Sequence, residues 1–357
     1  MAPARVDPER HAAPAGRQIT ARWAAVVGLA AWSALCSANA EPAASVDPAA
    51  LIAERYPTVE GVVAVRGNCV AWEYYRPPAN RETLQPVYSV TKSVLSILVG
   101  IAIDRGYLGL DRKLSELLPE TKQTNIDPRV GDVSVRDLLT MTSGFEPTSA
   151  LPRNGIPADK LWLWMIERPL INTPGAQFSY DSTSANLLAV VLARAVRQNS
   201  KMFAQSELFR PLRIRRYSWT TDYDGALIAA GSLSLTTRDM AKIGLLYLRR
   251  GLWGDRRVVS DAFVADATRK HNDGGPPVDA AYGYLWWVEA NDSGPNAFLA
   301  AGMGSQLIYV APQLDLVVAM SSAASVPGGS RAFVNTIIIP TVLARAAPRQ
   351  CAPLQNL

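Results

Sequence analysis

Strand-like patterns of apolar residues occur near both ends of the chain. Residues 61–65 and 70–75 flank a polar turn at 66–68, which predicts a β-hairpin. Four further strand-like segments lie toward the other end, at residues 282–288, 297–301, 306–310 and 316–320, and a turn at 312–315 joins the last two. A helix is expected after Ser330, bent or interrupted at Pro340 because proline cannot donate a backbone hydrogen bond.

The segments between these strands have helical patterns. Residues 87–103 are apolar nearly all round, which predicts a buried helix that ends near Gly106. Capping residues at 134–137 and 236–239 predict the starts of two more helices, and residues 186–197 carry an apolar helical stripe. We therefore expect an α+β fold in which residues 41–86 and 280–357 build one antiparallel sheet flanked by helices. Residues 87–279 would form an inserted, mostly helical subdomain, with the active site at the junction.

The first 40 residues have the pattern of a signal peptide. Arg17 and Arg22 precede an apolar run from Trp23 to Leu35, and Ala38-Asn39-Ala40 provides a small-residue cleavage site. The run is shorter than the roughly 20 apolar residues that span a membrane. We expect cleavage after residue 40 and a periplasmic or secreted protein without stable membrane insertion. The alternative is an uncleaved N-terminal membrane anchor.

The composition narrows the classes of function. Among 357 residues, 48% are hydrophobic and 19% charged, which excludes a disordered chain. The net charge of +5, without a basic run of five or more residues, argues against a nucleic-acid partner. Only two histidines occur, His11 and His271, so the mature chain cannot build a multi-histidine metal site. His271 lies in a polar, glycine-rich stretch typical of a surface loop, and we expect neither a metal nor a cofactor.

The chain has three cysteines, Cys36, Cys69 and Cys351, and no C-x-x-C pair, which excludes a zinc ribbon. Signal cleavage would leave Cys69 and Cys351. An oxidising compartment permits a disulfide between them, and the alternative is two unrelated buried thiols.

A candidate catalytic motif, Ser89-Val90-Thr91-Lys92, begins the buried helix. Residues i and i+3 share a helix face, so the hydroxyl and the amine can meet. The first helical turn favours developing negative charge, and burial lowers the pKa of a lysine so that it can act as a neutral base. The alternative is a helix-capping serine beside a lysine that extends to solvent.

Six segments in order resemble the serine β-lactamase and penicillin-binding-protein superfamily. The resemblance is greatest to its class C-like branch of esterases, D-aminopeptidases and 6-aminohexanoate-dimer hydrolases, and it covers about residues 50 to 345. It implies a β-lactamase/transpeptidase-like fold. The segments are residues 88–93, 135–145, 174–180, 231–241, 282–287 and 302–306.

The resemblance implies the role of each site residue. Ser89 corresponds to the acylated nucleophile, Lys92 to its base, and Tyr180 to the tyrosine that carries a proton to the leaving group. A tyrosinate beside a lysine ammonium can act as a general base below the free phenol pKa of about 10. The backbone N–H groups of Ser89 and Gln306 would form the oxyanion hole.

Two departures from the family pattern bear on the substrate. Ser182 stands where the Tyr-x-Asn motif has asparagine, and Met303-Gly304-Ser305 replaces Lys-Thr-Gly or His-Thr-Gly, so the cation that helps bind a β-lactam carboxylate is missing. The substrate-binding candidates are Ser182, Gly304, Ser305 and Gln306. Aromatic residues either line an apolar pocket or belong to the core; they are Trp162, Trp164, Trp286 and Trp287.

We therefore expect a serine hydrolase that cleaves a small linear amide or ester rather than a β-lactam. One alternative is a D,D-peptidase or β-lactamase-type enzyme acting on peptidoglycan stems or penicillins. The other is a catalytically silent binding protein on the same fold.

Overall fold

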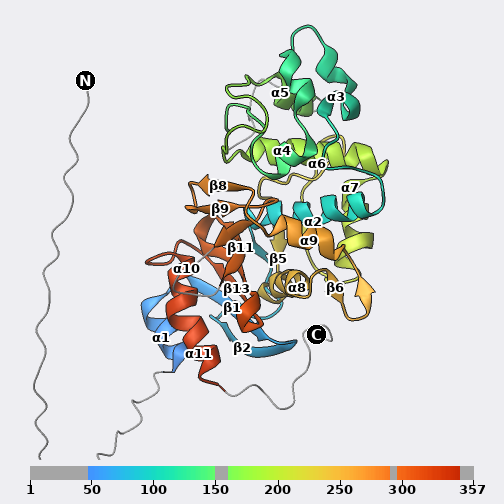
Figure 1. The fold of residues 1–357 in the computed structure, drawn as a ribbon. Coiled ribbons are helices and arrows are strands. Elements are labelled where there is room, and N and C mark those ends of the chain that lie inside the picture. The colour runs from blue at the N-terminus through green and yellow to red at the C-terminus, as the bar shows by residue number, and fades with distance from the viewer. Residues whose placement is uncertain (1–46, 149–159, 290–295, 346–357) are drawn as a thin grey trace, which may run out of the picture. The chain divides into compact units, whose positions relative to one another are not determined.

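The computed structural model describes residues 47–148, 160–289 and 296–345. The expected signal peptide lies outside these ranges. The main feature is an eight-stranded antiparallel sheet in the order β2-β1-β13-β12-β11-β10-β9-β8 (Figure 1). Its strands are β1 (Val59–Arg66), β2 (Cys69–Tyr75), β8 (Asn272–Gly275), β9 (Ala280–Tyr282), β10 (Trp287–Glu289), β11 (Ala297–Gly302), β12 (Gln306–Ala311) and β13 (Leu316–Ser322). Segments from both ends of the described chain therefore meet in one sheet, as predicted.

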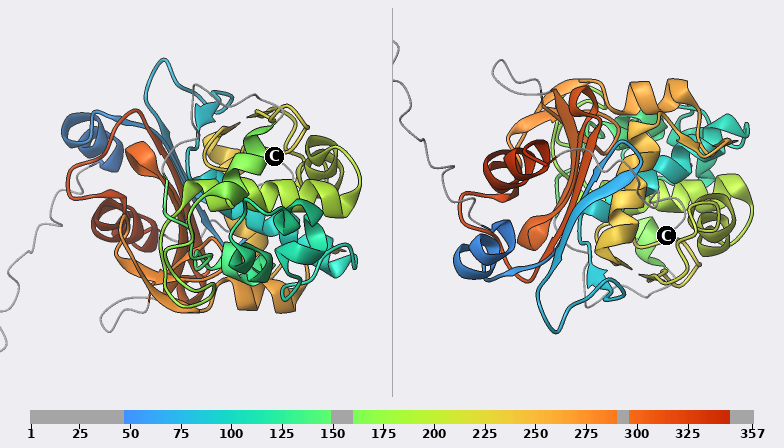
Figure 2. Two further views of the ribbon diagram at one scale, coloured as in Figure 1. Left: turned by 90° about the horizontal axis from the view of Figure 1, so that it is seen from above. Right: turned by 90° about the horizontal axis from the view of Figure 1, so that it is seen from below.

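The centre of the sheet is buried on both faces. All residues of β12 and β13 are buried, as are most residues of β1. This burial explains why these strands read as nearly continuous apolar runs rather than alternating ones. On one face lie α1 (Pro48–Arg55), α10 (Ser330–Phe333) and α11 (Ile339–Leu343), and most of the other helices lie on the opposite face (Figure 2).

The helix that carries the candidate motif, α2 (Val90–Asp104), lies between the sheet and α6 (Ser182–Val196). It is buried on nearly all sides, as its apolar sequence predicts. Gly100 permits close packing, because a Cβ at this position would lie 2.4 Å from the ring of Phe263 on α9 (Asp261–Ala267). The other helices are α3 (Leu114–Leu117), α4 (Val135–Leu139), α5 (Leu161–Glu167), α7 (Ser200–Ala204) and α8 (Thr237–Leu248).

Helix starts follow the capping signals in the sequence. Ser134 and Asp137 form the expected capping box at α4, and Thr236 caps α8. The helix expected at residue 186 begins earlier, at Ser182, because the Asp181 carboxylate accepts hydrogen bonds from the N–H groups of Thr183 and Ser184.

The sheet also differs from expectation in two places. The strand expected at 282–288 is divided into β9 and β10, separated by a turn in which Leu285 has a positive φ of 58°. The sheet begins before the expected boundary at residue 280, since β8 starts at Asn272. The division into two subdomains stays a prediction, whereas the α+β fold class is confirmed.

Two short sheets and a disulfide complete the description. One sheet pairs β3 (Gln85–Pro86), β5 (Leu233–Leu235) and β4 (Ser218–Trp219), and the other pairs β6 (Leu252–Trp253) with β7 (Arg256–Arg257). Cys69 is disulfide-bonded. Cys36 and Cys351 lie outside the described residues, so the pairing with Cys351 stays a prediction. Within the described ranges, no helix is long and apolar enough to cross a membrane.

Candidate active site

Ser89 lies at a strained junction between a strand and the helix α2. The N–H of Val87 donates to the carbonyl of Leu233 at 2.9 Å, which extends the pairing of β3 with β5. The next residue, Tyr88, has φ = 46°, a left-handed conformation that is costly for an aromatic residue. Ser89 then occupies the N-cap position of α2, but its side chain makes no capping hydrogen bond. The backbone turn leaves this hydroxyl free for another partner.

That partner is Lys92, one helical turn further along α2. The Lys92 Nζ lies 2.9 Å from the Ser89 Oγ and donates to the carbonyl of Ala230 at 2.7 Å. Lys92 is only 1% exposed, so it does not extend to solvent. Burial lowers the pKa of Lys92 from 10.5 to about 7, although the nearby Asp181 carboxylate opposes the shift. Near neutral pH, a large fraction of Lys92 is therefore an unprotonated amine.

Tyr180 approaches Ser89 from the loop that leads into α6. Its hydroxyl is hydrogen-bonded to Ser89, and its ring centroid lies 5.1 Å from the Lys92 Nζ. The ring stacks on Trp287 at 5.7 Å and meets Tyr282 edge to face. Burial in this aromatic setting raises the pKa of Tyr180 to about 12, and the hydrogen bond from Ser89 only partly opposes the shift. In the resting site Tyr180 is therefore a neutral phenol, which can donate a proton.

The turn between β11 and β12 lies beside Ser89. A Cβ built on Gly302 would lie 2.4 Å from the Val87 carbonyl oxygen and 3.3 Å from the Ser89 nitrogen. Within the described residues, no hydrogen-bond partner is found for the Ser89 N–H. Glycine at 302 thus keeps a backbone donor accessible at the position where an oxyanion would form.

Comparison with known proteins identifies the family. The beta-lactamase family model matches residues 49–342. The chain belongs to the beta-lactamase family. It is 26% identical over 320 residues to a 6-aminohexanoate-dimer hydrolase of Paenarthrobacter ureafaciens, which covers 80% of this chain and 79% of the relative.

Solved structures support the same fold. A D-stereospecific amidohydrolase from Streptomyces sp. has a TM-score of 0.66 at 17% identity, with 82% of this chain and 98% of that chain covered. EstCE1, described as a hydrolase with promiscuous acyltransferase activity, has a TM-score of 0.67 at 15% identity, with 84% and 97% covered. The expected β-lactamase/transpeptidase-like fold is confirmed, and the chain belongs to a family of serine hydrolases.

The structure brings together the three catalytic candidates of the sequence analysis, Ser89, Lys92 and Tyr180. The substrate-binding candidates are placed differently. The Ser305 Oγ accepts a hydrogen bond from the Val326 N–H at 3.0 Å, and the Gln306 Nε2 donates to the Ser322 carbonyl at 2.5 Å. These two side chains are used within the fold, so the turn that contains Gly304 offers backbone rather than side-chain groups. Ser182 is half-buried in the first turn of α6.

A buried ion pair supports the site from behind. The side chains of Asp181 and Arg168 are 1% and 3% exposed and lie 2.9 Å apart. Asp181 also accepts hydrogen bonds from the backbone N–H groups of Thr148, Thr183 and Ser184. This network fixes the backbone directly after Tyr180. Asp181 was not among the sequence candidates, although a charged residue beside a family tyrosine is a signal that could have found it.

Asn186 is a second residue that the sequence did not indicate. Its Oδ1 accepts a hydrogen bond from the Ala230 N–H at 2.9 Å, and the carbonyl of Ala230 accepts from Lys92. Asn186 is 3% exposed. It therefore holds the backbone of Ala230 on one side, while the Ala230 carbonyl accepts from the lysine amine on the other.

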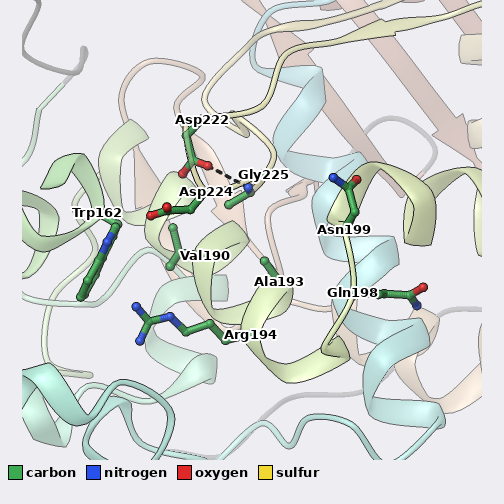
Figure 3. Close-up of a pocket in the computed structure, with 10 residues that line it drawn as sticks. Trp162, Val190, Ala193, Arg194, Gln198, Asn199, Asp222, Asp224 and Gly225 are labelled. Carbon is green, nitrogen blue, oxygen red and sulfur yellow. Dashed lines mark hydrogen bonds between the residues drawn. The ribbon is translucent and has the colours of Figure 1, made fainter. Parts of the chain in front are cut away.

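Of the aromatic candidates, only some lie at the site. Trp287 belongs to the aromatic cluster at Tyr180, whereas Trp286 is a core residue stacked on Tyr247 at 4.5 Å. Trp162 lines a separate cavity of about 480 Å³ with Arg194, Asp222 and Asp224 (Figure 3).

His271 contacts Asp266 and Tyr284. Its side chain is 9% exposed and stacks on Tyr284 at 4.2 Å, so the expectation of a surface-loop histidine is wrong for this side chain. Across the part of the chain that the structure describes, no group of three or more His, Cys, Asp or Glu side chains is arranged to hold a metal ion.

Proposed function

We propose that this protein is an exported serine hydrolase that cleaves a small linear amide or ester through an acyl-enzyme on Ser89. The observation that carries the proposal is the Ser89–Lys92 contact at 2.9 Å, made by a lysine whose pKa burial lowers to about 7, so that about half of it is neutral at pH 7. The expected partner is a small molecule, with neither nucleic acid nor stable membrane insertion involved.

Acylation begins with neutral Lys92. Its lone pair accepts the Ser89 proton as the Oγ attacks the substrate carbonyl. One N–H of Lys92 donates a hydrogen bond to the Ala230 carbonyl throughout. The tetrahedral oxyanion is stabilised by the N–H of Ser89 and, as the family likeness implies, by that of Gln306. Collapse breaks the bond to the leaving group, which takes the proton of Tyr180. The Lys92 ammonium then returns a proton to Tyr180, so both residues regain their starting states.

Deacylation reverses the proton path. A water molecule attacks the acyl carbonyl and gives its proton to the neutral amine of Lys92. The second tetrahedral intermediate collapses when Ser89 regains a proton and leaves as a hydroxyl. The carboxylic acid is released, and no other reactant is consumed.

Two observations favour a linear amide or ester over a β-lactam. At the position where the family has a cation, Met303 is 69% exposed and offers no charge for a carboxylate. Near the nucleophile, the half-buried rings of Phe178 and Tyr180 are backed by the buried rings of Tyr282 and Trp287 and suit an apolar acyl chain. The relative from Paenarthrobacter is itself described as a 6-aminohexanoate-dimer hydrolase.

Labelling with a fluorophosphonate probe tests the proposal. The wild type should be labelled covalently, and Ser89→Ala should not. Ser93→Ala is the matched control, because Ser93 lies one turn along the same helix and its Oγ donates only to the Leu285 carbonyl. Labelling of Ser89→Ala at the wild-type rate would overturn the assignment. Absence of labelling in the folded wild type would favour a silent binding protein.

A substrate panel separates the enzyme classes. It would contain nitrophenyl esters, linear amides, D-Ala-D-Ala peptides and penicillins. Tyr180→Phe should slow amides by about 10²–10⁴-fold and activated esters less, because an amine must be protonated on leaving whereas a nitrophenolate need not be. Equal losses on both substrates would contradict the proton-donor role. Turnover of D-Ala-D-Ala peptides or penicillins alone would favour the peptidase alternative.

Export has its own test. N-terminal sequencing of secreted or periplasmic protein should begin at or near Glu41. An intact N-terminus retained in the membrane fraction would show instead that residues 1–40 act as an anchor.

A further inference from the structure

Another cavity, which shares no lining residue with the candidate active site, is lined almost entirely by charged residues. It has a volume of about 470 Å³ and lies at the N-terminal end of α8, beside the small sheet of β3, β5 and β4. Three chain segments contribute to it: residues 81–82, 213–216 and 236–242. The six cations that line it are Arg81, Arg213, Arg215, Arg216, Arg238 and Lys242.

The carboxylates near the cavity do not balance these cations. Glu73 pairs with both Arg81 and Arg238, and Asp239 pairs with Lys242 at 2.9 Å. The third carboxylate, Glu82, lies 3.5 Å from Arg216 and is largely exposed. Six cations against three carboxylates leave an excess of three positive charges.

Two of the arginines have no ionic partner. Arg213 and Arg215 are exposed, and neither forms an ion pair or a side-chain hydrogen bond within the described residues. Both arginines belong to the segment 213–216, and the carbonyl of Arg213 accepts a hydrogen bond from the buried Lys242 at 3.3 Å. The backbone that carries these guanidinium groups is thus anchored, while the groups themselves are available to a ligand.

We propose that this cavity binds a small oligoanion of the phosphate class, such as a di- or triphosphate group. Guanidinium groups match phosphate oxygens with two parallel hydrogen bonds, which makes arginine the preferred residue for this recognition. An excess of three charges in one cavity suits a ligand that carries several negative charges, and the volume suits a small molecule. The proposal is independent of the chemistry at Ser89.

Isothermal titration calorimetry of the full-length protein with sodium tripolyphosphate tests the site. The test variant is Arg213→Gln with Arg215→Gln, because these exposed residues make no ion pair and their removal should leave the fold intact. The matched control is Arg256→Gln with Arg257→Gln, which removes the same charge from the exposed strand β7 beyond the other end of α8. Titration with adenosine triphosphate shows whether a free oligophosphate or one carried on a nucleoside fits better.

The wild type should bind tripolyphosphate with a dissociation constant below about 1 mM at 0.15 M salt. The test variant should lose at least about tenfold in affinity, the control variant less than about twofold, and hydrolysis of an ester should be unchanged in both. Equal losses in the two variants would show diffuse attraction to a basic surface and overturn the proposal. It would also be overturned if the wild type bound only long polyanions such as heparin.

Discussion

Replacing Asp181 by asparagine should move the pH dependence of catalysis in a defined direction. The substitution keeps the size of the side chain and an oxygen that can cap α6, but it removes the negative charge. Burial lowers the pKa of Lys92 to about 7, and the charge of Asp181 is what opposes this shift. Without that charge, the pKa of Lys92 should fall below 7. Because neutral Lys92 is the active form, the acidic limb of kcat/KM should move to lower pH.

The size of the effect follows from the lysine's titration. A shift of one pKa unit corresponds to about 1.4 kcal/mol, which is the interaction energy of two unit charges about 12 Å apart at an effective dielectric constant of about 20. With a pKa of about 7, roughly a tenth of Lys92 is neutral at pH 6; with a pKa one unit lower, about half is neutral. The variant should therefore gain about fivefold over the wild type in relative rate at pH 6, when both are normalised at pH 8.

The assay is the pH profile of kcat/KM for a nitrophenyl ester between pH 5 and 9, with thermal melting recorded at each pH. Asparagine at 181 leaves Arg168 buried without its partner, which costs about 3–5 kcal/mol of stability. The double variant Arg168→Met with Asp181→Asn removes both buried charges. It allows the pH profile to be compared with that of the wild type if Asp181→Asn alone unfolds below the assay temperature. Asp239→Asn is the matched control, since it breaks a similarly buried pair with Lys242 away from Ser89. An acidic limb of Asp181→Asn that stays in place or moves to higher pH would refute the reasoning.

Three further results are expected. Lys92→Met should raise the free energy of unfolding at pH 7 by about 2–5 kcal/mol, because the pKa of Lys92 is about 7 in the folded protein and 10.5 when unfolded. Between these two pKa values the unfolded wild type binds more protons than the folded protein, so the wild type becomes more stable as pH rises. In urea titrations the stability difference between variant and wild type should therefore shrink from pH 7 to pH 10.5. Equal urea midpoints of the two proteins at pH 7 would show that burial of Lys92 does not destabilise the fold. Gly302→Ala should lower kcat by about 10²–10³-fold, because the added Cβ would press on the Val87 carbonyl and crowd the N–H of Ser89 that is expected to bind the oxyanion. Near-normal turnover of this variant would exclude that role for the N–H. Non-reducing peptide mapping should detect a disulfide-linked pair of peptides that contain Cys69 and Cys351. A Cys69 peptide linked to any other cysteine would contradict this pairing.

Local sequence patterns predict much of the fold and two of the catalytic candidates, Ser89 and Lys92. The hairpin of β1 and β2 follows from a polar turn between apolar segments, and the burial of Lys92 follows from a helix that is apolar on all sides. These features depend on residues close together in the chain. They could be predicted because helix and strand periodicities fix which side chains share a face.

Other features of the site depend on contacts between distant segments. Lys92 and Ala230 are 138 positions apart, and Asn186 joins them from a third element. The protonation state of Tyr180 in the resting site also depends on distant segments. A lysine one turn from the serine suggests a tyrosinate, but burial against Trp287 and Tyr282 raises the pKa of Tyr180 instead. Desolvation depends on the whole fold, which the motif does not contain.

The two interpretations of Ser89 that the sequence left open predict different geometries. A capping serine would turn its oxygen to the N–H groups of the first helical turn, yet Ser89 makes no such hydrogen bond and contacts Lys92 instead. A lysine that extends to solvent would be exposed, yet Lys92 is 1% exposed. The left-handed backbone of Tyr88 adds a third cost at the same position. Strain, a buried amine and an unused helix cap each destabilise the folded protein, and a structural role for Ser89 requires none of them. Their coincidence at one hydroxyl favours the catalytic interpretation, because activation of that hydroxyl is what all three provide.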